Sequence, residues 1–134
     1  MLKLVKTASP RRVPMDHVEA GLRAFYRIAE KWDLANDQAM VLLGQPAKAT
    51  FFKWKKGDVA TAAQSLDLAS RLSYVLGIFK SLEIIYQRPD FADRWLAEPN
   101  LAFGGQSALD RMMGGQITDL ASVRDYLDSV RGGW

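Results

Sequence analysis

The chain has 134 residues, of which 49% are hydrophobic and 25% are charged, and its formal net charge is +3. This length predicts a single domain, and the composition is that of an ordinary globular protein, which argues against wholesale disorder. The sequence contains no cysteine and one histidine, His17. Disulfides, thiolate nucleophiles and cysteine-based zinc sites are therefore excluded, and a Ser-His-Asp triad is nearly so.

Positive charge is concentrated in the first part of the chain. Residues 1–60 contain eleven Lys and Arg against six acids, and residues 61–134 contain seven against nine, so the two parts carry net charges of +5 and −2. A basic part can bind a polyanion by releasing its condensed counterions, although an ordinary solvated surface fits the same charge. No apolar run approaches the ~20 residues that span a bilayer and no signal-peptide core is present, so we expect a cytoplasmic protein.

The N-terminal residues predict a tail followed by a helix. Residues 1–14 are basic, contain Pro10 and Pro14 and lack apolar periodicity, so we expect a flexible tail. Apolar residues then recur at spacings of three and four, which predicts an amphipathic helix over residues 15–32.

Two short helices are predicted next. The first covers residues 36–43, with Asn36 as its N-cap and Gly44 as its stop. The second covers residues 46–56 and opens on Pro46, since proline is tolerated at the first helical position.

The remaining sequence predicts a long central helix and three shorter ones. Residues 61–88 form the longest periodic segment, which Pro89 closes. Its main apolar stripe is Ala62, Leu66, Ala69, Leu72, Leu76, Phe79 and Leu82, widened by Leu68, Val75, Ile78, Ile85 and Tyr86. So wide a face predicts a helix contacted from several sides or packed on a second copy. The shorter helices are predicted over 91–97, 108–113 (capped by Ser107) and 118–130. No strand alternation is present, so the predicted fold is all-α.

The two short helices are typical of a helix-turn-helix motif, whose second helix enters the major groove of DNA. At about 100° per residue, Ala47, Phe51 and Trp54 fall on the core side of this second helix. The outward face carries the candidate DNA-binding residues Lys48, Ala49, Phe52, Lys53 and Lys56. The lysines suit phosphates or a guanine edge, and Ala49 and Phe52 suit a thymine methyl group. A plain helical hairpin with solubilising lysines fits the pattern equally well.

The last residue, Trp134, follows Arg131 and two glycines. A terminal Trp docks either on its own domain or in the pocket of a partner, where Trp and Arg are favoured contact residues.

Residues from about 36 to 134 resemble antitoxins of the Xre/MbcA/ParS type, whose partner is a RES-domain toxin. In the front part the resemblance rests on Leu42-Leu43-Gly44 and on the run from Thr50 to Gly57. In the back part the motifs follow in order as Arg94-Trp95-Leu96, Pro99-Asn100, Phe103-Gly104-Gly105, Leu109-Asp110, Met112, Tyr126-Leu127 and Arg131-Gly132-Gly133-Trp134. The family often has a proline where this chain has Ala108, and residues 1–14 align with nothing in it.

The resemblance implies a non-enzymatic type II antitoxin that needs no cofactor or metal. Residues 15–60 would form a helix-turn-helix region that binds promoter DNA of the protein's own operon, as a homodimer. Residues 61–134 would form the long helix and a small helical domain that caps a NAD-consuming toxin. The implied toxin-binding residues are Trp95, Asn100, Phe103, Gly104, Arg131, Gly132, Gly133 and Trp134, with Arg131 and Trp134 blocking the toxin's active site. The alternative is a stand-alone helix-turn-helix transcription regulator whose C-terminal half is a dimerisation domain.

Overall fold

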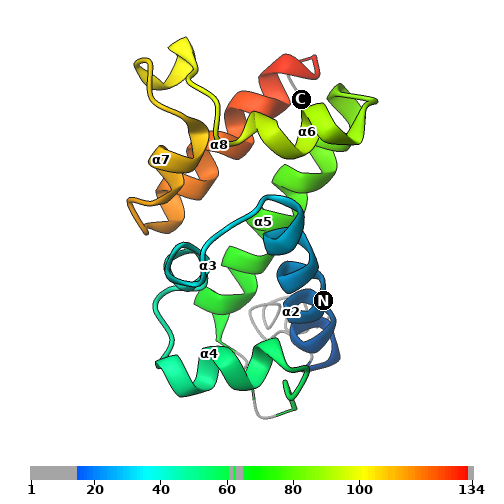
Figure 1. Ribbon diagram of the computed structural model, residues 1–134, viewed down its shortest axis with the longest axis vertical. Coiled ribbons are helices and arrows are strands. Elements are labelled where there is room, and N and C mark those ends of the chain that lie inside the picture. The colour runs from blue at the N-terminus through cyan, green and yellow to red at the C-terminus, as the bar shows by residue number, and fades with distance from the viewer. Residues whose placement is uncertain (1–14, 61, 63–64, 133–134) are drawn as a thin grey trace, which may run out of the picture.

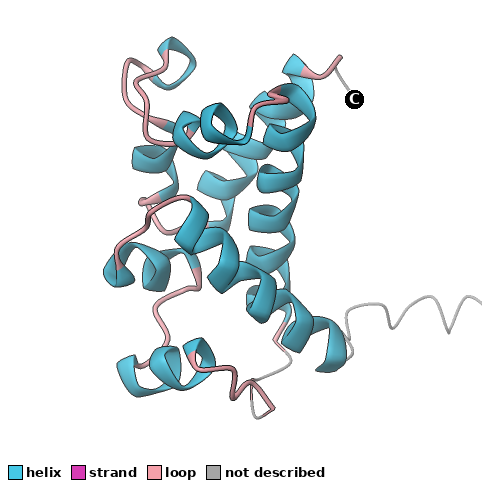
Figure 2. Ribbon diagram, turned by 45° about the vertical axis from the view of Figure 1, so that its right-hand side comes forward, coloured by secondary structure: helices cyan, strands magenta, loops and turns pink. Residues whose placement is uncertain are grey.

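The computed structural model describes residues 15–60, 62 and 65–132, so the predicted basic tail lies outside the described residues. Figure 1 shows an elongated molecule in which α5 (Leu66–Ile85) runs through the centre. Figure 2 shows the described residues as helices joined by loops, without a strand, which confirms the predicted all-α fold.

Two groups of helices lie at opposite ends of α5 (Figure 1). The α2–α4 end consists of α2 (Met15–Lys31), α3 (Asn36–Leu42) and α4 (Lys48–Lys55). The α6–α8 end consists of α6 (Pro89–Trp95), the 3-10 helix η1 (Leu101–Phe103), α7 (Ala108–Met112) and α8 (Ile117–Val130). Because α5 packs against α2, α6 and α8, the prediction of a central helix contacted from several sides is confirmed.

The starts of α3 and α4 both differ from the prediction. Gly44 and Gln45 both adopt left-handed backbone angles, with φ of 86° and 61°, so the chain turns there and α4 begins at Lys48 rather than at Pro46. Asn36 is not an N-cap, because it is the first residue of α3. Its side-chain oxygen instead accepts a hydrogen bond of 2.8 Å from the Lys55 ammonium, which ties the start of α3 to the end of α4.

The long helix is shorter than predicted, and its buried face is centred on the residues that were predicted to widen the main stripe. Ser65 caps α5 by accepting a 3.0 Å hydrogen bond from the Leu68 amide. Pro89 does not close this helix, which ends at Ile85; it is the first residue of α6. The buried residues of α5 are Leu68, Arg71, Leu72, Val75, Ile78, Ser81 and Leu82, of which only Arg71 and Ser81 were not predicted. Within the predicted main stripe, Ala69, Leu76 and Phe79 are only partly buried and Leu66 is 55% exposed.

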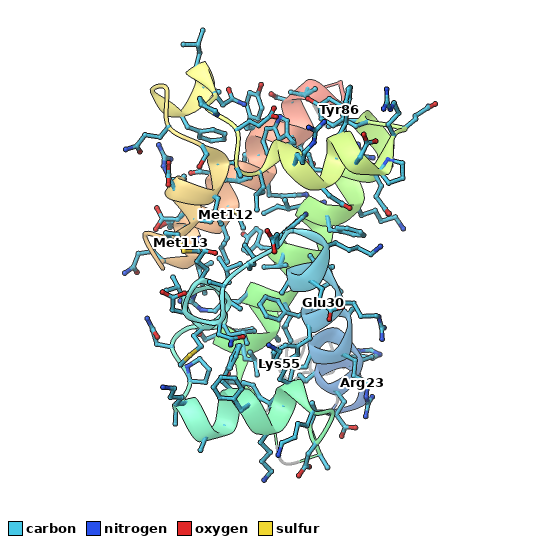
Figure 3. All side chains as sticks on the ribbon, in the orientation of Figure 1. Arg23, Glu30, Lys55, Tyr86, Met112 and Met113 are labelled. Carbon is cyan, nitrogen blue, oxygen red and sulfur yellow. The ribbon has the colours of Figure 1, made fainter. Side chains whose placement is uncertain are left out.

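A single hydrophobic core extends through both ends of the molecule. Leu22 and Phe25 of α2 are fully buried at one end, and Met112 and Leu120 are fully buried at the other. Figure 3 shows Met112 at the α6–α8 end. At the start of α7 Ser107 accepts a 3.0 Å hydrogen bond from the Asp110 amide, as the predicted cap requires. Among the described helices none is long and apolar enough to cross a membrane.

Arg71 is a charged residue within this core and is only 8% exposed. Its guanidinium donates to the α3 carbonyls of Val41 and Leu42 at 3.5 and 3.4 Å, and to the Gly115 carbonyl at 2.9 Å. It also pairs with Asp67 at 2.9 Å. Since Gly115 lies between α7 and α8, the side chain of Arg71 joins the two ends of the molecule.

Candidate functional site

The inward face of α4 is firmly anchored. Phe51 is fully buried and Trp54 is 8% exposed, as the helical spacing predicts, whereas Ala47 is exposed at the helix start, contrary to the prediction. The Tyr26 hydroxyl of α2 donates a 2.8 Å hydrogen bond to the Phe51 carbonyl. Burial raises the pKa of this hydroxyl above its ordinary value. Tyr26 therefore holds α4 on α2 as a neutral donor.

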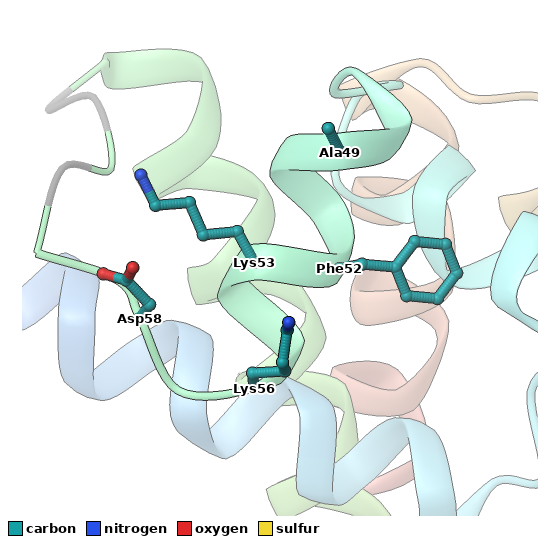
Figure 4. Close-up of a pocket in the computed structure, with 5 residues that line it drawn as sticks. All are labelled: Ala49, Phe52, Lys53, Lys56 and Asp58. Carbon is teal, nitrogen blue, oxygen red and sulfur yellow. The ribbon is translucent and has the colours of Figure 1, made fainter.

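The outward face of α4 presents the residues that the spacing singled out. Lys48, Ala49, Lys53 and Lys56 are exposed, and Phe52 is half-buried. All of these except Lys48 line a hollow of about 340 Å³ together with Asp58 (Figure 4). In Figure 4 Phe52 and Lys53 point to opposite sides of the helix, so Phe52 lies at the edge of this face, where its ring packs edge-on against Phe51 at 5.1 Å.

Three aromatic rings hold the α6–α8 end together. The rings of Trp95 and Tyr126 stack at 6.2 Å with an interplanar angle of 11°. Phe103 meets Tyr126 edge-on at 5.4 Å, and the Arg111 guanidinium lies 5.7 Å from the centre of the Phe103 ring. Phe103 is 7% exposed and Trp95 is half-buried. These two candidate residues therefore support the surface of this end by packing beneath it.

The segment after α6 is a tightly bonded loop built around Asn100. The Asn100 side chain accepts a 2.9 Å hydrogen bond from the Ala102 amide, and its backbone carbonyl accepts from Phe103 and Gly105, both at 3.0 Å. Gly104 and Gly105 have φ of 69° and 89°, which favours glycine. Asn100 and Gly104 thus fix the loop, in which the Leu101 side chain is 93% exposed.

The residues after α8 return toward α5. The Arg131 guanidinium donates a 3.3 Å hydrogen bond to the hydroxyl of Ser81, which is itself buried. Gly132 is exposed with φ of 125°, and the candidate residues Gly133 and Trp134 lie outside the described residues.

Two features escaped the sequence analysis. Leu101 stands in a stretch without periodicity, so nothing marks its side chain as exposed. A second hollow of about 290 Å³ lies between α2 and the C-terminal end of α4 and is lined by several basic residues. Lys55 and Lys56 are a partial signal for it, but its other wall belongs to α2 and depends on how the two helices pack. In the described part of the chain no group of three His, Cys, Asp or Glu side chains is placed to hold a metal ion.

Comparison with known proteins identifies the class. Residues 81–133 match the family of the antitoxin Xre/MbcA/ParS C-terminal toxin-binding domain, a match that begins inside α5 and takes in α6, α7 and α8. The chain is also 47% identical over 116 residues to protein y4oB of Sinorhizobium fredii (strain NBRC 101917 / NGR234), covering 87% of this chain and 88% of that one. Residues 81–133 therefore belong to the Xre/MbcA/ParS family of antitoxin toxin-binding domains, and the chain as a whole belongs to the same family as y4oB. No solved structure matches it.

Proposed function

We propose that this antitoxin neutralises a NAD-consuming RES-domain toxin by covering its active site, and that it represses its own operon by binding promoter DNA as a homodimer. The observation that carries the toxin-binding role is the match of residues 81–133 to a toxin-binding domain. Exposed apolar side chains support this role. The described part of the chain exposes five large hydrophobic residues, and four of them lie within the matched segment, namely Ile84, Phe91, Leu101 and Val130. Apolar side chains of this kind are suited to burial against a protein partner.

Co-expression with the toxin encoded in the same operon tests this role. We expect the two proteins to copurify and the cellular NAD level to recover. Failure of both, with the antitoxin folded, would favour the stand-alone transcription regulator.

A truncation that removes residues 131–134 tests how the active site is blocked. If Arg131 and Trp134 block the cleft, the shortened chain still copurifies with the toxin but no longer restores NAD. Full inhibition by the truncated chain would refute the blocking role and leave only the covering role.

DNA binding is supported by the exposed lysines on the outward face of α4. The variant Lys53→Ala/Lys56→Ala is expected to bind the promoter more weakly and with a smaller salt dependence, because lysines that contact phosphates release counterions. The control Lys80→Ala/Arg88→Ala removes two charges from exposed positions outside the α2–α4 end. Toxin neutralisation should survive the change at 53 and 56. Unchanged promoter affinity and salt dependence would show that this face does not bind DNA.

The homodimer is supported by an apolar hollow of about 180 Å³ between α2 and α5, lined in part by Val18, Gly21, Ala69 and Leu76. Leu66, 55% exposed, begins the same helix. We expect Leu76→Glu to convert a dimer into a monomer in light scattering, without unfolding, because Leu76 is only partly buried in the single chain. A dimer that persists would move the interface elsewhere.

A further inference from the structure

The hollow between α2 and α4 is more basic than the one on the outward face of α4. The hollow between α2 and α4 is lined by Arg23, Tyr26, Arg27, Glu30, Trp54, Lys55, Lys56 and Gly57, which gives four cationic side chains against one acid. The hollow on the outward face has two lysines against Asp58. A polyanion is therefore attracted more strongly to the α2/α4 hollow.

Two helices and two aromatic side chains, Tyr26 and Trp54, line this hollow. Arg23 and Arg27 lie one helical turn apart on α2, and both are exposed. Between them Tyr26 bonds to the Phe51 carbonyl, which fixes the distance between α2 and α4. Trp54, which is 8% exposed, also lines the hollow. Figure 3 shows Arg23 and Glu30 on α2 and Lys55 at the end of α4.

Three of the four cations are available to a ligand. The side chains of Arg27 and Lys56 have no hydrogen-bond or ion-pair partner among the residues that the structure describes. Arg23 faces Glu19 at 3.7 Å, and this pair is weak because the Arg23 side chain is 49% exposed. Lys55 is different, because its ammonium donates a 2.8 Å hydrogen bond to the Asn36 side chain. Lys55 therefore lines the hollow mainly with the methylene groups of its side chain.

We propose that the α2/α4 hollow binds phosphates of the DNA backbone beside the groove that α4 enters. The proposal rests on the proposed promoter binding. Lys56 lines both hollows, so the basic surface continues from the outward face of α4 to Arg23 and Arg27. Guanidinium groups bind phosphate oxygens through paired hydrogen bonds, and such contacts fix the register of a protein on DNA without reading its sequence. An acidic protein segment carries the same charge, but residues 81–133, which match the toxin-binding domain, lie mostly at the other end of the molecule.

The test uses the full chain, a promoter fragment and a fragment of random sequence, with affinities measured over a range of KCl concentrations. Arg23→Gln/Arg27→Gln is expected to reduce the slope of log affinity against log salt by about 1.8, or about 0.9 for each phosphate that an arginine no longer neutralises. At about 0.1 M KCl the affinity for both fragments should fall by the same factor, roughly 10- to 50-fold. The ratio between the two affinities should therefore stay constant. Lys80→Gln/Arg88→Gln removes the same charge outside the α2–α4 end and should leave the slope unchanged.

Each other outcome counts against the proposal in a distinct way. If the wild-type protein does not bind the promoter, the proposed repression fails and the phosphate site fails with it. If the wild type binds and Arg23→Gln/Arg27→Gln keeps the full slope, only the phosphate site is refuted. A changed affinity ratio would assign the arginines to base reading. Loss of toxin copurification in place of DNA binding would assign the hollow to a protein partner. Thermal unfolding of each variant shows that it is folded.

Discussion

Replacing Arg71 with methionine is expected to destabilise the protein by about 2–4 kcal/mol. The side chain is 8% exposed and bonds to α3 on one side and to Gly115 on the other. Methionine has a similar length and no donor, so Arg71→Met leaves these carbonyl groups without their partner. The tie between the two ends of the molecule is removed as well.

The magnitude follows from the geometry of the individual bonds. The 2.9 Å bond to Gly115 is charge-assisted, and such bonds contribute about 1.5–3 kcal/mol. The bonds to Val41 and Leu42, at 3.5 and 3.4 Å, are long, and together they add about 0.3–1 kcal/mol at the C-terminus of α3. The pair with Asp67 adds at most about 1 kcal/mol, because the Asp67 side chain is 56% exposed. Apolar burial of the methionine recovers part of the loss.

Urea and thermal unfolding measure this effect, and the melting temperature should fall by roughly 10 °C for a chain of this size. Arg124→Met is the matched control, because Arg124 pairs with Asp128 at 3.2 Å but both side chains are about one-third exposed, at 33% and 35%. That variant should lose less than about 1 kcal/mol. An Arg71→Met protein as stable as the control would refute the reasoning that Arg71 joins the two ends.

Three further changes test other interactions. Tyr26→Phe should cost about 1 kcal/mol at pH 7, because the hydrogen bond to Phe51 is removed. Burial raises the pKa of Tyr26, so this tyrosine ionises in the unfolded chain at a lower pH than in the folded protein. The free energy of unfolding of the wild type should therefore decrease as the pH rises past about 10. Unfolding curves at a series of pH values should show that Tyr26→Phe lacks the part of this decrease that Tyr26 causes. A Cβ at Gly77 would overlap the Arg124 guanidinium and displace it. Gly77→Ala alone should therefore be nearly neutral, because the higher helix propensity of alanine is offset by the displaced arginine. In a double-mutant cycle the same change should stabilise an Arg124→Ala protein by about 1 kcal/mol. Leu101→Ser should leave the melting temperature unchanged, since the side chain is 93% exposed, and should weaken toxin binding roughly 10- to 100-fold in calorimetry if the toxin buries it.

Apolar periodicity and helix-ending or capping residues predicted those features of the helices that depend on residues close together in the sequence. Gly44 follows the end of α3 with a left-handed backbone, as expected of a helix stop, and Ser107 caps α7. The inward and outward faces of α4 also follow from helical spacing, with Phe51 inside and Lys53 outside. Each of these outcomes depends on residues within one turn of each other.

The features that sequence missed depend on packing between distant segments. A buried arginine is rare, so the apolar pattern of α5 passed over Arg71, although it included the buried neighbours Leu68, Leu72 and Val75. Its partners, Val41 and Gly115, are 30 and 44 residues away along the chain. Likewise Asn36 was predicted to be a cap because of its residue type, but it bonds to Lys55, which only the fold brings near.

The placement of α5 constrains how the two proposed activities relate. The N-terminal half of α5 packs closely on α2, since a Cβ at Gly21 would lie 3.3 Å from Leu72. Farther along, α5 packs against α8, and the absence of a side chain at Gly77 leaves space for the Arg124 guanidinium. The helix therefore completes the core of both ends, and Arg71 bonds across the remaining junction. Packed cores switch between discrete arrangements rather than bending continuously. A toxin held at the α6–α8 end would accordingly keep a fixed orientation relative to DNA held at the α2–α4 end, so the spacing of two bound toxins on an operator is set by the fold and by the dimer and not by a flexible linker.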